Sequence, residues 1–141
     1  MKPTALALSI GLATPGCIPH CDNPSDCIGG NVCAADGECH APNELVSARI
    51  TWTIAGAAAS STTCPTGSLR IGFVTGYDRY GDPHELVYAP VPCAEGVFSI
   101  GNLPSYEQIE VGYDTGDSFA HGQFADPNGD GGAAVDLPAS D

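Results

Sequence analysis

Basic residues are nearly absent from this chain of 141 residues, which has 4 Lys and Arg against 17 Asp and Glu and a net charge of −13. Proteins that bind nucleic acid need clusters of Lys and Arg to neutralise phosphates, so this class of partner is excluded. Binding to anionic lipid head groups through charge is excluded for the same reason. This excess of acidic residues is typical of a soluble exported protein whose copies repel one another, or of a protein that binds cations.

Catalytic motifs and a long apolar run are also lacking. The histidines His84 and His121 lie outside any G-x-S-x-G elbow, and no glycine-rich stretch has the lysine and spacing of a phosphate loop. The apolar run Ala5–Ala13 is shorter than the roughly 20 residues that cross a bilayer. We therefore predict a protein that is not an enzyme and needs no cofactor, apart from a weak calcium site considered below.

What the chain does contain is turn residues and cysteine, with 18 Gly, 12 Pro and 7 Cys. So many turn formers indicate little helix. So many cysteines in a short chain indicate disulfides and an oxidising compartment.

The first residues have the three parts of a secretory signal, namely a positive Lys2, the apolar run and small or turn-forming residues after it. We predict a signal peptide over residues 1–16. The end of this segment, ATPGC, resembles the lipobox of bacterial lipoproteins, with Gly16 and Cys17 carrying the likeness while Thr14 and Pro15 differ from it.

The lipobox resemblance implies that Cys17 carries lipid and becomes the first residue of the mature chain. Because Ile18 and not Asp follows it, the resemblance also implies the outer membrane or cell surface of a Gram-negative bacterium. The number of cysteines agrees with lipidation of Cys17, because six cysteines then remain and an even number can all pair in disulfides. With an ordinary cleaved signal instead, the protein would be secreted or periplasmic and Cys17 would be free or paired.

Residues 17–43 form a cysteine-rich neck and a linker. Four cysteines recur every six residues among turn formers, at Cys21, Cys27, Cys33 and Cys39. A segment this short and polar cannot offset its chain entropy by burial, so we predict two disulfides here, with three pairings open. Zinc is the alternative, but the close C-x2-4-C spacing of structural zinc sites is missing, and we expect His20 and His40 to be solvated loop residues.

The run CDNPSDCIGGNVCAADGEC resembles the small disulfide modules near the start of bacterial surface proteins, and is similar to EGF-like and Dickkopf-like modules. This resemblance implies crossed pairing, Cys21–Cys33 with Cys27–Cys39.

From residue 44 the pattern changes to period two, which predicts a half-buried strand with a core tryptophan. Further short strand-like runs follow, separated by turns. We predict an all-β fold, a seven- to eight-stranded antiparallel sandwich over residues 44–141. The residues expected to face its core are Val46, Ala48, Ile50, Trp52, Ile54, Leu69, Ile71, Phe73, Ile109, Val111 and Tyr113.

Two cysteines lie inside the predicted sandwich. Cys64 precedes the strand Leu69–Phe73, and Cys93 follows the strand Glu85–Ala89. If these strands pair antiparallel, the two cysteines lie at adjacent ends. Parity and this geometry predict the disulfide Cys64–Cys93.

The segment GVFSIGNLPSYEQIEV resembles a signature of prealbumin-like sandwiches, the carboxypeptidase regulatory-like and Cna B-like domains, through Phe98, Ile100, Leu103 and Pro104. The resemblance implies a spacer, stalk or interaction module. Lys–Asn isopeptide bonds, which some Cna B-like domains form, are excluded because a cleaved chain would lack Lys2, its one lysine. The chain as a whole resembles small lipoproteins of Gram-negative bacteria.

Two binding sites come into question. Asp126, Asn128 and Asp130 match the start of a calcium loop, D-x-[DN]-x-[DN]-G, although the same residues also suit a hairpin turn. Any calcium site would be weak, since the acid at position twelve of the loop is missing.

The second candidate is a contact patch for a glycan or a protein, made by four tyrosines, although scattered surface tyrosines without such a role are common: Tyr77, Tyr80, Tyr88 and Tyr106. Taken together, the sequence favours a non-enzymatic, lipid-anchored envelope protein that contacts the membrane only through its lipid and presents a structural or interaction module. The alternatives are a glycan- or protein-binding module, with or without calcium, and an exported inhibitor or accessory protein.

Overall fold

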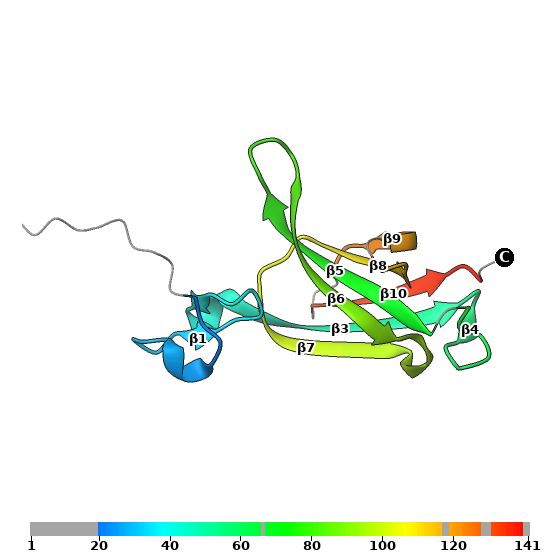
Figure 1. Cartoon of the computed structure of the whole chain (residues 1–141), viewed down its shortest axis with the longest axis horizontal. Coiled ribbons are helices and arrows are strands. Elements are labelled where there is room, and N and C mark those ends of the chain that lie inside the picture. Colours follow the sequence, from blue (N-terminus) through cyan, green and yellow to red (C-terminus); the bar gives the residue numbers. More distant parts are fainter. Residues whose placement is uncertain (1–19, 66, 117–118, 128–130, 140–141) are drawn as a thin grey trace, which may run out of the picture.

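The computed structural model describes residues 20–65, 67–116, 119–127 and 131–139, and they form a β-sandwich that follows a short neck (Figure 1). The all-β prediction is confirmed. The predicted signal peptide and Cys17 lie outside the described residues. Within the described ranges, no helix is long and apolar enough to cross a membrane.

The neck consists of two 3-10 turns and a two-stranded antiparallel sheet. Its disulfides are Cys21–Cys33 and Cys27–Cys39, the crossed pairing that the resemblance implied. The elements, in chain order, are η1 (Pro24–Asp26), β1 (Val32–Cys33), β2 (Cys39–His40) and η2 (Pro42–Glu44).

Within the described residues, the sandwich has two sheets with seven long strands and one short strand, which agrees with the predicted number. One sheet has the order β10 (Gly132–Leu137), β3 (Leu45–Ile54) and β7 (Val97–Pro104), and β4 (Ala57–Ala58) pairs with the end of β3. The other has the order β6 (Pro83–Pro92), β5 (Ser68–Tyr77), β8 (Gln108–Asp114) and β9 (Phe119–Ala125). The 3-10 turn η3 (Cys93–Glu95) connects β6 to β7.

One strand pair differs from the antiparallel prediction. β10 runs parallel to β3, with Ala133 opposite Ile50 and Val135 opposite Trp52. The chain leaves β9 in one sheet and crosses to the other sheet before β10 begins. Alternation of apolar residues fixes which face of a strand is buried but not its direction, so the pattern could not reveal this pairing.

The core between the sheets contains the residues predicted from period two, with one exception. Trp52 is 3% exposed, and its Nε1 donates a hydrogen bond of 2.7 Å to the carbonyl oxygen of Cys93. Val46 is 38% exposed and does not belong to the core. It lies near the start of β3, where the pairing with β7 shifts register between Val46 and Ala48. A bulge of this kind redirects side chains near the end of a ladder.

The disulfide Cys64–Cys93 is also present, with the two Cα atoms 6.0 Å apart. β5 and β6 pair antiparallel with Ser68 opposite Pro92, which brings the chain before β5 next to the chain after β6. The predicted bridge and the strand geometry behind it are confirmed.

The neck contacts the sandwich through its backbone. The Ala35 N–H donates a hydrogen bond of 2.9 Å to the carbonyl oxygen of Asn102 in β7. Asn102 has a positive φ of 55°, a left-handed conformation that Asn adopts more readily than most residues. The neck is therefore joined to the sandwich by this contact as well as by the chain that leads into β3.

Candidate metal centre

The predicted calcium loop is described only in part. Asp126 lies just after β9 and is exposed, while Asn128 and Asp130 lie outside the described residues. The hypothesis of a weak calcium site therefore stays a prediction.

The predicted tyrosine patch is wrong for two of its four members. Tyr88 and Tyr106 are half-buried, and both rings pack edge-on against Phe73, with centroids 5.9 and 5.1 Å apart. The Tyr106 hydroxyl also donates a hydrogen bond to the carbonyl oxygen of Gly131. The sequence analysis included both in the contact patch, but both rings pack against the edge of the core.

The other two tyrosines are exposed at the end of the β5–β6 hairpin, which projects from the sandwich and is drawn in green (Figure 1). Tyr77 is 54% exposed and Tyr80 is 75% exposed. The Arg79 guanidinium lies 4.7 Å from the centroid of the Tyr80 ring. Hydrogen bonds from the N–H groups of Asp82 and Tyr80 to the Asp78 carboxylate order the turn, and they lower the pKa of Asp78.

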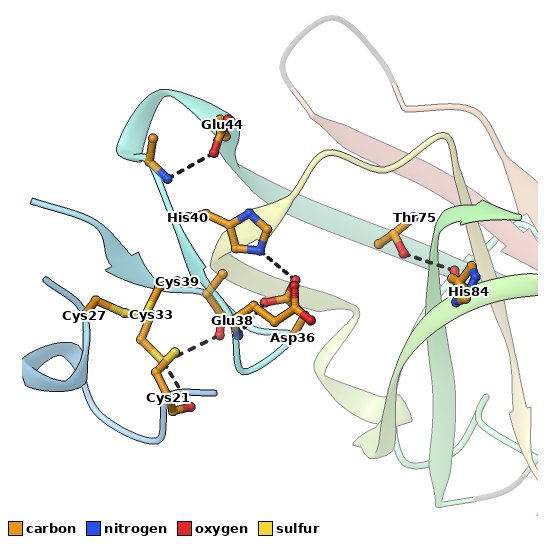
Figure 2. A network of polar contacts seen from close by, with 12 residues as sticks. Cys21, Cys27, Cys33, Asp36, Glu38, Cys39, His40, Glu44, Thr75 and His84 are labelled. Carbon is orange, nitrogen blue, oxygen red and sulfur yellow. Dashed lines mark hydrogen bonds and ion pairs between the residues drawn. A yellow bond between two sulfur atoms is a disulfide. The ribbon is translucent and has the colours of Figure 1, made fainter. Parts of the chain in front are cut away.

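A group of possible metal ligands that sequence reasoning missed lies in the neck. The side chains of Asp36, Glu38 and His40 point toward one another (Figure 2). One ligand atom from each lies within 4.8 Å of the other two, and His40 Nε2 is 2.8 Å from Asp36 Oδ2. The His40 and Asp36 side chains are 23% and 20% exposed. The prediction that His40 is a solvated loop residue is therefore wrong, whereas His20, with a side chain 74% exposed, agrees with it.

A tight turn between β1 and β2 brings these three side chains together. The Gly37 N–H donates to the Ala34 carbonyl at 3.0 Å, and the Ala34 N–H donates to the Glu38 carbonyl at 2.9 Å. Gly37 has a φ of 78°, and a Cβ there would come within 2.7 Å of the His20 ring. The positive φ therefore favours glycine here, as in three-residue hairpin loops that end in a left-handed residue, and any larger residue would also displace the exposed His20 ring.

The turn also orients Asp36. Its Oδ1 accepts a hydrogen bond of 3.0 Å from the Glu38 N–H, so both carboxylate oxygens have fixed partners. The negative charge of Asp36 also acts on Tyr88 of the sandwich. Burial raises the pKa of Tyr88, and the Asp36 carboxylate raises it further. The group, which we call the junction cluster (Asp36, Glu38 and His40), therefore lies where the neck meets the sandwich.

The thiol-zinc alternative is not compatible with the neck as it stands. The sulfur atoms of Cys21, Cys27 and Cys39 lie within 4.8 Å of one another, but all three belong to disulfides. A disulfide sulfur offers no thiolate to zinc.

A second charged group lies on the outer face of the sheet that contains β5. Burial raises the pKa of Glu85, and a Cβ on the neighbouring Gly72 would lie only 2.0 Å from its Oε1. Burial also raises the pKa of Glu110, and the negative charge of Glu85 raises it further. The positive charge of Arg70 acts in the opposite direction on the pKa values of Glu85 and Glu110. Gly72 thus leaves space for the Glu85 side chain, and the charge of Arg70 acts on both carboxylates.

Comparison with protein-family models, curated proteins and solved structures gives no significant match.

Proposed function

We propose that this chain is a non-enzymatic, lipid-anchored cell-envelope protein that presents its β-sandwich as a structural or interaction module. Cys17 is the anchor, residues 1–16 are the signal peptide, and the disulfide neck is the spacer between the lipid and the sandwich. The outer membrane or cell surface of a Gram-negative bacterium is the proposed location.

The observation that carries this proposal is the use of cysteine. The three disulfides take up six of the seven cysteines, so none of the other cysteines in these 141 residues is left to pair with Cys17. Disulfides of this number favour an oxidising compartment, and a signal-like segment directly precedes Cys17. A lipidated cysteine accounts for the odd number and for the position of Cys17 at the end of that segment.

The test is the partitioning of the full chain, expressed in a Gram-negative host, between detergent and aqueous phases. We expect the wild type in the detergent phase and the Cys17→Ser variant in the aqueous phase, with incorporation of labelled fatty acid lost in the variant. A wild type that stays in the aqueous phase and takes up no label would contradict the anchor.

A glycan- or protein-binding module is the second candidate function, and the exposed β5–β6 hairpin favours it. Tyr77 and Tyr80 present two amphipathic rings on a turn that Asp78 orders, and ordered aromatic side chains make good contact residues. Replacing both tyrosines with Ser should abolish binding in a glycan array or a screen of exported proteins. Phe124→Ser, at a site that is 61% exposed on β9, is the matched control.

A further inference from the structure

We propose that the junction cluster binds one first-row divalent cation of the zinc class through Asp36, Glu38 and His40. This site is distinct from the calcium loop and from the disulfide sulfurs, and it does not depend on the proposed anchor.

The ligand set fits this class of ion. One imidazole nitrogen and two carboxylate oxygens are common zinc ligands, at about 2.0–2.2 Å from the metal. In a tetrahedron with such bonds, the ligand atoms lie about 3.4 Å apart. The ligand atoms of the cluster lie within 4.8 Å of one another, and His40 Nε2 lies 2.8 Å from Asp36 Oδ2, so side-chain movements of about 1 Å would close the site. Calcium is disfavoured because it takes oxygen ligands and the cluster offers a nitrogen.

Charge favours a cation at this point. Two carboxylates converge with a single imidazole, and in the part of the chain that the structure describes, ion pairs are made only by histidines. No arginine is therefore paired with Asp36 or Glu38, and the chain as a whole carries a net charge of −13. A divalent ion would bind between His40 Nε2 and Asp36 Oδ2 and would neutralise the charge of both carboxylates.

The scaffold holds the ligands close to the required arrangement before any ion binds. Disulfides fix both strands of the β1–β2 hairpin, and Gly37 sets its turn. The hydrogen bond from Ala35 to Asn102 fixes the residue next to Asp36 against the sandwich. Little ordering entropy remains to be lost on binding. The partial exposure of the cluster leaves room for water to complete the coordination shell.

The experiment is calorimetric titration of the full, oxidised chain with zinc chloride, supported by the absorption spectrum of cobalt as a substitute ion. We expect one ion per chain and an affinity that falls as the pH is lowered, because protons and metal compete for the same imidazole nitrogen. His40→Ala should weaken binding by roughly 10–100-fold or more, since even changes beyond the direct ligands cost that much.

Glu38→Gln is the decisive variant, because it leaves the His40–Asp36 pair intact and the Glu38 N–H still available to Asp36. It should also weaken zinc binding at least about tenfold while the disulfides and the melting temperature without metal stay unchanged. His84→Ala removes an exposed histidine of the sandwich and is the matched control, with wild-type affinity expected.

Three results would overturn the proposal. One is a wild type that shows no saturable binding up to millimolar zinc. Another is zinc binding as strong as that of the wild type in both the Glu38→Gln and the His40→Ala variants. The third is binding that is lost in Asp126→Ala with Asp130→Ala but kept in Glu38→Gln, since the ion would then belong to the predicted calcium loop.

Discussion

The disulfide Cys64–Cys93 should be the largest single covalent contribution to the stability of the sandwich. The perturbation is the double variant Cys64→Ala with Cys93→Ala, which removes the bridge and leaves both neck disulfides in place. Cys93 is fully buried, and its carbonyl accepts the hydrogen bond from Trp52, so the bridge ends beside the core.

The expected magnitude follows from the length of the closed loop. The two cysteines are 29 positions apart, and the loop-entropy relation then gives about 3.6 kcal/mol at 25 °C. Loss of the buried Cys93 sulfur adds about 1 kcal/mol through poorer packing. The sum, about 4–5 kcal/mol, corresponds to a fall in melting temperature of roughly 16–40 °C, because each kcal/mol shifts the melting temperature of a domain of about 100 residues or fewer by about 4–8 °C.

Denaturant unfolding followed by Trp52 emission measures this loss, because Trp52 is the only tryptophan and is buried. The matched control is Cys21→Ala with Cys33→Ala, which opens a neck loop with a separation of 12. We expect this control to shift the Trp52 transition less than the sandwich variant does. A loss below about 1 kcal/mol in Cys64→Ala with Cys93→Ala would refute the loop-entropy reasoning.

Two further predictions concern the pH dependence of stability. Hydrogen bonds from Thr53 and Gly56 lower the pKa of Asp136 in the folded state, so its contribution is present above the ordinary Asp pKa and is lost as the pH falls through the lowered value. Asp136→Asn should therefore melt below the wild type at pH 7, and the gap should close in acid; an equal gap at both pH values would contradict this. Burial raises the pKa of Glu85, so its contribution is present below the ordinary Glu pKa and is lost as the pH rises through the folded value. Glu85→Gln should melt above the wild type at pH 7 and match it in acid, and a melting temperature at or below the wild type at pH 7 would count against burial as the cause.

Much of the fold could be predicted because period-two patterns report burial directly. Ile50, Trp52 and Ile54 are all in the core, as the alternation required. The pairing of Cys64 with Cys93 followed from parity and from the order of two strands. The parallel direction of β10 and the exposure of Val46 could not be predicted, because they depend on a crossover between sheets and on a register shift that the local pattern does not encode.

Part of the junction cluster could have been predicted from the spacing of its residues in the sequence. Glu38 and His40 are two positions apart, and alternate residues of an extended segment share one face, whereas Asp36 joins them only through the turn at Gly37. The many turn formers of the neck hide this spacing, because they predict turns and not an extended segment. What no local pattern could reveal is that the Ala35–Asn102 hydrogen bond places the cluster against the sandwich, since its partners are 67 positions apart.

This contact bears on how an anchored chain would hold its sandwich. Cys17 is four positions before Cys21, and four residues can span at most about 14 Å. If Cys17 carries lipid, the neck therefore stays close to the membrane surface. The neck is in turn joined to the sandwich at two places, through the chain that enters β3 and through the hydrogen bond to Asn102. A second connection restricts the rotation of the sandwich relative to the neck that a single linker would allow. The neck therefore holds the sandwich in a more fixed orientation than a flexible linker would. An ion in the junction cluster would bind His40, which leads into β3, and Asp36, which adjoins Ala35, and would thereby link both connections through one centre.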